Sequence, residues 1–212
     1  MHYLTRQSVS RFLGLSMLLA IVGCVGGAPE QRSSAPAKTR VEATDVSPEL
    51  QRDYSNAQTL MSVEDYEGAA EILQPLAVSY PEYPAVSTLL AIAWRKLALT
   101  EQAQGLLEST LAAHEDFAPA LNEVGILYRE SGDFAAAEAA YMKAVTVKPD
   151  YALAHFNFGI LLDLYLGRHE QALTHYERYQ ELAPGEDKQV GRWIADISRR
   201  LERSARTAKV GQ

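Results

Sequence analysis

The chain has 212 residues, of which 47% are hydrophobic and 22% are charged, which suits a soluble globular or repeat protein with enough length to bury a core. Its formal net charge of −7 argues against the phosphate backbone of nucleic acids as the main partner, because affinity there comes from clustered Lys and Arg. The single cysteine, Cys24, excludes an intramolecular disulfide and a metal site built from cysteines.

Residues 1–23 have the features of a signal peptide. Arg6 and Arg11 lie in a mostly polar beginning, and residues 12–23 form the apolar run FLGLSMLLAIVG. A helix that spans a bilayer needs about 20 residues, so this run is too short to cross and fits the apolar region of a signal peptide. Its removal would leave 18 basic and 27 acidic residues, a net charge of −9.

The apolar run ends in Ile21-Val22-Gly23-Cys24, which resembles the bacterial lipobox. The resemblance implies cleavage between Gly23 and Cys24 and acylation of Cys24, and two or three acyl chains anchor a protein where one would be marginal. Val25 replaces the Asp that is associated with retention in the inner membrane, so the resemblance implies a lipid anchor at the periplasmic face of the outer membrane. The alternatives are an ordinary signal peptide with a chance cysteine, or a short core helix.

Residues 24–48 comprise this cysteine and a disordered tether. The segment is rich in Gly, Ala, Pro, Ser and Thr and has almost no large apolar residue, so it cannot bury enough surface to fold. As a flexible chain of about 24 residues it would reach roughly 25–30 Å. Ser47 and Pro48 then predict the N-cap and first turn of a helix.

Residues 49–184 repeat at a spacing of 34 residues, with one extra residue in the last unit. Each unit has a small residue followed in three units by Ile, then an Ala, then a Leu or Tyr. The recurring residues are Ala57, Ala91, Gly125 and Gly159; Ile92, Ile126 and Ile160; Ala69, Ala103, Ala137 and Ala172; and Leu73, Leu107, Tyr141 and Tyr176. The predicted units are residues 50–83, 84–117, 118–151 and 152–185, and Pro81, Pro149 and Pro184 mark helix ends.

This pattern resembles the tetratricopeptide repeat (TPR). The third unit matches it best, at Leu121, Val124, Gly125, Tyr128, Ala137, Tyr141, Ala144 and Pro149. The resemblance implies an all-α fold, a right-handed α-solenoid of about four helix-turn-helix repeats. A small residue on each first helix lets the second helix approach closely, where a larger side chain would overpack. Gly132 and Gly167 lie where the first helix must end and the chain reverse.

The two ends of the array depart from the pattern. Asp53 and Asn56 replace large apolar residues in the first unit, so its outer face is expected to be exposed as a start cap. The extra residue of the fourth unit lies in LLDLYLG, where it would lengthen the first helix or bulge its end. Residues 185–205 predict a capping helix, because Val190, Ile194, Ile197 and Leu201 recur at helical spacing beside Trp193, and residues 206–212 are expected to fray.

In this family, function generally lies in the concave groove lined by the first helices. By family geometry the groove residues include Tyr54, Gln58, Thr88, Ile92, Arg95, Lys96, Asn122, Ile126, Arg129, Phe156, Asn157, Ile160 and Asp163. The carboxylate clamp that grips a peptide C-terminus is absent, since its places hold Tyr54, Gln58, Leu89, Pro119 and Glu123. The Ile row with its flanking Asn suits an extended or helical peptide. The alternative is that the Ile row is repeat core.

Other features of the sequence favour structural roles. His169 and His175 are six residues apart, whereas a zinc pair on one helix face needs a spacing of four, and His155 stands at a normally aromatic packing position. Five arginines make the last helix basic, which is typical of a solvated face, although anionic lipid or an acidic partner is an alternative: Arg192, Arg199, Arg200, Arg203 and Arg206. Nucleophile, nucleotide and dinucleotide motifs are absent, so we expect no catalysis, no cofactor and no metal.

The function that the resemblance implies is a periplasmic, lipid-anchored TPR adaptor. It would bind a peptide or subunit of an envelope machine, like the TPR lipoproteins that act as pilotins for type IV pilus secretins and those associated with Flp-type pili. The alternatives are a regulator that docks peptidoglycan hydrolases or synthases, an accessory of a TonB-like energy-transducing complex, and a self-assembling structural protein that forms a homodimer. No nucleic-acid partner is expected.

Overall fold

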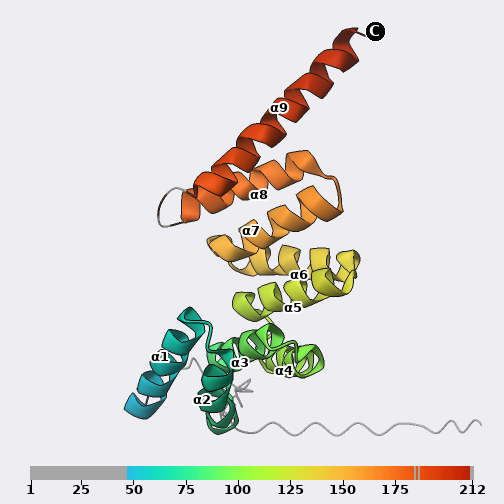
Figure 1. Ribbon diagram of the computed structural model, residues 1–212. Helices are drawn as coiled ribbons and strands as arrows, with labels where there is room; N and C mark the ends of the chain where they lie inside the picture. Colours follow the sequence, from blue (N-terminus) through green and yellow to red (C-terminus); the bar gives the residue numbers. More distant parts are fainter. Residues whose placement is uncertain (1–46, 184, 186, 211–212) are drawn as a thin grey trace, which may run out of the picture. The chain divides into compact units, whose positions relative to one another are not determined.

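The computed structural model describes residues 47–183, 185 and 187–210. Within these residues the fold is all-α, as predicted, with nine α-helices, one π-helical segment and no strand (Figure 1). The elements are α1 (Pro48–Ser62), α2 (Tyr66–Ser79), α3 (Pro84–Lys96), α4 (Thr100–Ala113), α5 (Ala118–Ser131), α6 (Phe134–Val147), α7 (Ala152–Ile160), η1 (Leu161–Tyr165), α8 (His169–Leu182) and α9 (Lys188–Val210). The predicted signal peptide, cleavage site Gly23–Cys24 and tether lie outside the described residues.

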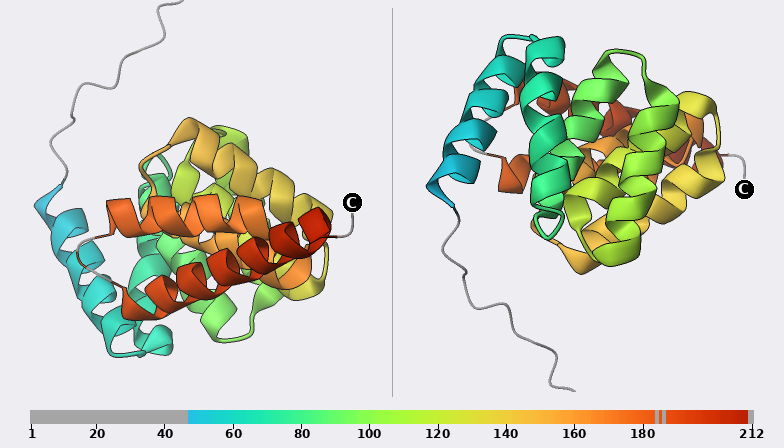
Figure 2. Two further views of the ribbon diagram at one scale, coloured as in Figure 1. Left: turned by 90° about the horizontal axis from the view of Figure 1, so that it is seen from above. Right: turned by 90° about the horizontal axis from the view of Figure 1, so that it is seen from below.

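The helices stack in chain order as four helix pairs and a last single helix. Within each pair the first helix packs on the second, as α1 does on α2, and the second then packs on the first helix of the next pair (Figure 2). The first helices also contact one another, since α3 touches α5 and α5 touches α7. The helices α3, α5 and α7 therefore form a continuous layer, which is part of the layer that the sequence assigns to the groove.

The turn inside each pair uses a left-handed backbone conformation at one equivalent position. Gly132 has φ +85° and Gly167 has φ +64°, which glycine adopts without steric cost. In the first two pairs the same place holds Glu64, with φ 61°, and Ala98, with φ 59°. A side chain there costs about 1–2 kcal/mol, so these two turns are strained where the later two are relaxed.

The residue at the close-packing position of the first helix is smaller where the side chain that faces it from the second helix is larger. A Cβ on Gly125 would lie 2.6 Å from Cε1 of Tyr141, and a Cβ on Gly159 would lie 2.6 Å from Cε1 of Tyr176. Both tyrosines are almost completely buried. In the second pair Ala91 shares a core cluster with the smaller Leu107. The glycines therefore make room for tyrosine rings in the last two pairs.

The extra residue of the fourth unit is absorbed in the π-helical turn η1. The Leu166 N–H donates to the Leu161 carbonyl at 3.1 Å, a bond across five residues in place of four. Of the two outcomes left open by the sequence, the structure has the bulge. The bulge leaves Leu164 70% exposed and Tyr165 44% exposed at the end of the first helix.

Helix α9 is longer than the sequence prediction. We expected it to end near residue 205 and residues 206–212 to fray, but it continues to Val210. Neither Gly nor Pro interrupts residues 192–210, and Arg and Ala are good helix formers. Its apolar side packs on α8, with Val190 and Ile197 buried. Residues 202–208 are exposed, so the last two turns extend beyond this packing.

Candidate functional site

The predicted groove residues come from the layer of first helices, but their exposure differs. Gln58 and Lys96 are exposed, and Asn122 and Ile126 are buried with Thr88. The remaining predicted residues are partly buried: Tyr54, Ile92, Arg95, Arg129, Phe156, Asn157, Ile160 and Asp163. Among the predicted groove residues, the two exposed ones therefore lie on α1 and α3.

A chain of polar contacts joins three successive first helices. Arg95 on α3 donates from Nη2 and Nε to Glu123 Oε2 on α5, at 3.2 and 3.3 Å, and from Nη1 to Glu130 Oε1 at 3.3 Å. Asn122 donates to Glu123 Oε1 at 3.3 Å, and Asn157 on α7 donates to Asn122 Oδ1 at 2.9 Å. We call these five residues the polar ladder. It fixes α3, α5 and α7 side by side.

Glu123 is the buried carboxylate at the centre of the polar ladder. Burial raises the pKa of Glu123, because a charged carboxylate loses hydration, and the neighbouring Arg95 opposes this rise. Its side chain is only 10% exposed and that of Arg95 only 15%. The pair is therefore a structural ion pair, and a partner in the groove would meet the side chain of Arg95 already engaged.

The burial of Asn122 and Ile126 corrects two of the groove assignments. Ile126 is 7% exposed and belongs to the core cluster of the last two pairs, against which Ile160 packs. Asn122 is 1% exposed and its amide is used by the polar ladder. The core alternative therefore holds for Ile126, and Ile92 keeps an accessible part because it is only half-buried.

Phe156 also has a packing role. Its ring lies 5.0 Å from that of Tyr179 on α8 and stacks 6.1 Å from that of Trp193 on α9. It therefore holds the last helix against the fourth pair. Tyr54 is packed against the core of the first two pairs, and burial raises the pKa of its hydroxyl.

Next to the π-helical turn, a cation lies against exposed aromatic surface. The Arg129 guanidinium carbon is 5.7 Å from the centre of the Tyr165 ring, and that ring is 4.9 Å from Phe134. Arg129 Nε also donates to the Tyr141 hydroxyl at 3.5 Å. The neighbouring Asp163 lies 3.0 Å from His169 Nδ1 and 3.7 Å from Arg200. Near the bulge, the predicted groove residues Arg129 and Asp163 are therefore both engaged in contacts within the chain.

Two histidines pair behind the groove. His155 Nε2 lies 3.2 Å from the Pro149 carbonyl, and its Nδ1 lies 2.9 Å from His175 Nδ1. Since the carbonyl can only accept, His155 Nδ1 accepts from His175. Burial lowers the pKa of both, that of His175 to about 4. Both rings are therefore neutral packing groups at pH 7, the role expected for His155.

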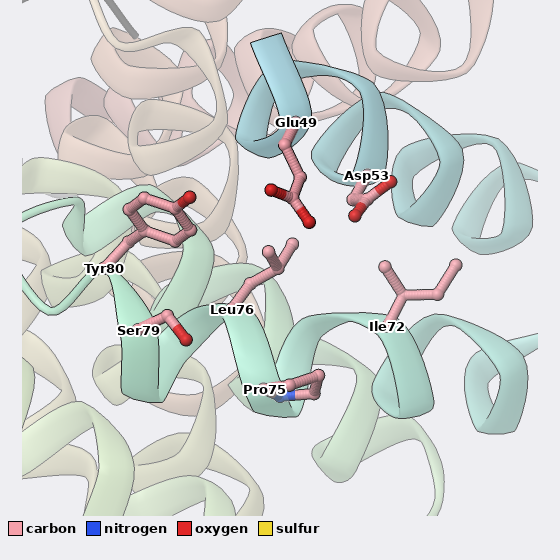
Figure 3. Close-up of a pocket in the computed structure, with 7 residues that line it drawn as sticks. All are labelled: Glu49, Asp53, Ile72, Pro75, Leu76, Ser79 and Tyr80. Carbon is pink, nitrogen blue, oxygen red and sulfur yellow. The ribbon is translucent and has the colours of Figure 1, made fainter. Parts of the chain in front are cut away.

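A separate hollow of about 420 Å³ lies between α1 and α2 (Figure 3). Glu49 and Asp53 project toward it from α1, and α2 supplies an apolar floor that includes Ile72 and Leu76. Sequence reasoning treated Asp53 only as the mark of a start cap. The acidic rim above apolar residues was missed, and its one signal was the spacing of four between the two carboxylates.

No helix in the described part of the chain is long and apolar enough to cross a membrane. Over the same residues, no group of three or more His, Cys, Asp and Glu side chains is placed to hold a metal ion.

Comparison with known proteins identifies the repeat. The family described as tetratricopeptide repeat matches residues 95–152 and 123–187. A search of the curated proteins found no match. Similar solved structures include the pilF protein of Pseudomonas aeruginosa, with 18% identity and a TM-score of 0.63 over 73% of this chain and 70% of that one.

Two further structures share the fold. A thermophilic TPR protein of Thermus thermophilus, TTC0263, has 23% identity and a TM-score of 0.61 over 70% of this chain and 80% of its own. MamA of Desulfovibrio magneticus has 16% identity and a TM-score of 0.56 over 76% of this chain and 90% of its own. Such arrays present extended concave surfaces for binding other proteins. Residues 95–187 therefore match the tetratricopeptide repeat, and the described part of the chain shares the fold of solved TPR proteins, a fold that serves as a scaffold for protein–protein interaction.

Proposed function

We propose that the chain is a lipid-anchored periplasmic adaptor that binds a peptide or subunit of an envelope machine on the concave side of α1 and α3. The observation that carries the binding face is that Gln58 on α1 and Lys96 on α3 are exposed and that Ile92 on α3 is only half-buried. Further along the layer, the polar groups are already engaged in the polar ladder and around η1.

The partner's chemistry follows from these three side chains. Gln58 offers both a donor and an acceptor to a peptide backbone. The Lys96 ammonium, which lies 5.9 Å from the centre of the Tyr66 ring, offers three donors to a carboxylate or carbonyl. The accessible part of Ile92 can cover an apolar side chain of the partner. An extended segment with one apolar residue flanked by polar or acidic ones fits this arrangement.

The sequence supports the proposed lipid anchor, and the similarity to one solved structure supports the proposed kind of envelope machine. The lipobox at Gly23–Cys24 supports a lipid anchor, and Val25 supports the outer membrane. The likeness to the pilF protein supports a pilus or secretion system, although it is a likeness of fold at 18% identity. A regulator of peptidoglycan enzymes and an accessory of a TonB-like complex are the other candidates. A homodimer is a fourth.

Site-specific photo-crosslinking in the native host tests the binding face. A photoreactive residue would replace Gln58 or Lys96, with Gln102, exposed on the second helix α4, as the matched control. Ile126 and Asn122 are unsuitable, because replacement of a buried side chain would disturb the fold. Capture of a pilus or secretion subunit from both concave positions and not from Gln102 would support the proposal.

Other outcomes redirect it. Capture of wall hydrolases from the same positions would favour the peptidoglycan regulator, and capture of proton-channel or TonB-like proteins would favour the energy-transducing complex. Equal capture from Gln102 would contradict a concave binding face. The anchor is tested separately, because a Cys24→Ser variant should lose incorporation of labelled fatty acid and leave the membrane fraction. Retention of either property by the variant would contradict lipidation at Cys24.

A further inference from the structure

Opposite charges are segregated to the two ends of the repeat array. Residues 47–83, which contain α1 and α2, hold seven acidic residues and one basic residue, a net charge of −6. Helix α9 holds seven basic residues and two acidic ones, a net charge of +5. This difference between the first and last elements makes the two ends electrostatically complementary.

The positive charges of α9 form one stripe on its free side. At 100° per residue, five basic residues fall within about 60° of one another, on the face opposite the apolar stripe that packs on α8. These residues, which we call the basic stripe, are Lys188, Arg192, Arg199, Arg203 and Arg206, and all five are exposed. The stripe is about 27 Å long, since 18 residues of helix rise 1.5 Å each.

The basic stripe is not used up by contacts inside the chain. Arg199 lies 3.8 Å from Asp196 and Arg206 lies 3.8 Å from Glu202, both long pairs between exposed side chains on the helix itself. Such pairs contribute little. Arg203 takes part in none of the ion pairs found among residues 47–183 and 187–210. The stripe is therefore open to an acidic surface.

The hollow between α1 and α2 has the chemistry to receive arginine. Glu49 and Asp53 rim it, with Asp53 paired at 2.7 Å with the exposed Arg52 beside it, and its floor is Ile72, Pro75 and Leu76 (Figure 3). An arginine side chain lays its methylene stem on apolar surface while its guanidinium pairs with a carboxylate. At about 420 Å³ the hollow has room for one such side chain.

We propose that the chain associates with a second copy of itself head to tail, with the basic stripe of α9 in one copy docked over the acidic hollow between α1 and α2 of the next. Such a contact uses different surfaces on the two copies, so it leaves a free end on each side and builds open chains. It involves the ends of the array and not the concave face, so it goes beyond the proposed function and stands or falls separately from it.

Anionic lipid is the competing occupant of the basic stripe. A helix that binds a membrane surface buries large apolar side chains below the headgroups. In α9 the large apolar residues Val190 and Ile197 are buried in the protein, and the free side between Lys188 and Arg206 carries charged residues and the small Ala195 but no large apolar one. The acidic hollow supplies both carboxylates and apolar floor, so a second copy is the better fit.

Two charge-reversed variants of the full chain test the proposal by sedimentation velocity in mild detergent. Glu49→Lys with Asp53→Lys blocks the hollow, and Arg203→Glu with Arg206→Glu blocks the stripe outside the part of α9 that packs on α8. The wild type is expected to self-associate at low salt and to dissociate in about 1 M salt, where charges are screened beyond about 3 Å. Each variant should associate at least about tenfold more weakly.

A mixture of the two variants gives the decisive readout. Each keeps the surface that the other lacks, and the two reversed surfaces are themselves opposite in charge, so the mixture should regain the association that neither variant shows alone. Lys143→Glu, exposed on α6, is the matched charge reversal and should associate like the wild type. A monomeric wild type, self-association unchanged in both variants, or a mixture that fails to pair would overturn the proposal. So would binding of the wild type to phosphatidylglycerol vesicles that is lost in the stripe variant and occurs without self-association.

Discussion

Replacement of Gly125 by Ala tests the close approach of α5 and α6. The new Cβ would lie 2.6 Å from Cε1 and 2.7 Å from Cδ1 of Tyr141, well inside van der Waals contact. The Tyr141 ring cannot withdraw easily, since it is completely buried and stacks 6.0 Å from the ring of Phe158. Something in the core must therefore shift.

The expected magnitude is a balance of two effects. Overpacking costs about 2–3 kcal/mol, near the upper end for an added methyl group, because the ring is confined. Alanine in a helix gains about 1 kcal/mol over glycine. The net loss in the free energy of unfolding should be about 1–2 kcal/mol. Gly105→Ala in α4 is the matched control, because the Cβ added there would meet no neighbouring atom within 4 Å. This variant should gain about 1 kcal/mol in the free energy of unfolding.

Urea unfolding followed by circular dichroism measures both changes, with the slope checked because repeat arrays can lose cooperativity. Adding Tyr141→Leu to Gly125→Ala reproduces the Ala91 and Leu107 combination of the second pair. The double variant should recover about 1–2 kcal/mol relative to the sum of the single changes. If Gly125→Ala stabilised the protein as much as Gly105→Ala, the steric reasoning would be refuted.

Three further predictions concern charge, backbone strain and pH. Arg95→Ala should lower the free energy of unfolding in urea by about 3–5 kcal/mol, because it leaves the Glu123 carboxylate buried without its cation. Glu123→Gln should lower it by about 1 kcal/mol or less. Equal losses in the two variants would contradict a buried ion pair. Ala98→Gly should raise stability by about 0.5–1 kcal/mol, because glycine adopts the positive φ of this turn without strain. Ala112→Gly within α4 is the control and should lower stability by about 1 kcal/mol. A loss of stability in both variants would contradict backbone strain at Ala98. Because the folded pKa of His175 is lowered from 6.5 to about 4, its contribution is fully present above about pH 6.5 and is lost as the pH falls toward 4. For this half-buried ring the loss of stability is about 1–2 kcal/mol after solvent screening. Thermal unfolding measured over a pH series should show this loss in the wild type and not in His175→Gln. The same pH profile in both proteins would contradict the neutral pair.

The repeat register could be predicted because each recurring residue has a local mechanical reason. Gly125 and Gly159 face tyrosines across the helix pair, and Gly132 and Gly167 take the left-handed turn. These requirements repeat with the chain and need no knowledge of its neighbours. The extra residue before Gly167 was visible as a shift in register, but its π-helical form depends on hydrogen bonds that the spacing alone does not specify.

The site residues were harder to predict, because exposure at a groove position depends on the lateral fit of neighbouring pairs. Ile92 and Ile126 occupy equivalent places, yet the second is buried by the tyrosine-containing pairs around it. The contact of Arg95 with Glu123 joins residues 28 apart on different helices, so no helical periodicity reveals it. The length of α9 was underestimated because its large apolar residues stop at Leu201, whereas Arg and Ala sustain the helix further.

The most direct test of the concave binding face is the affinity of the crosslinked partner for two matched variants, measured by calorimetry. Gln58→Trp with Lys96→Glu alters the two exposed side chains of the proposed face, and Gln102→Trp makes the equivalent bulky change on the second-helix side. The partner should bind the first variant at least about tenfold more weakly, a loss of about 1.4 kcal/mol or more, and the second with unchanged affinity. Unchanged affinity for the concave variant, or an equal loss in Gln102→Trp, would contradict the account.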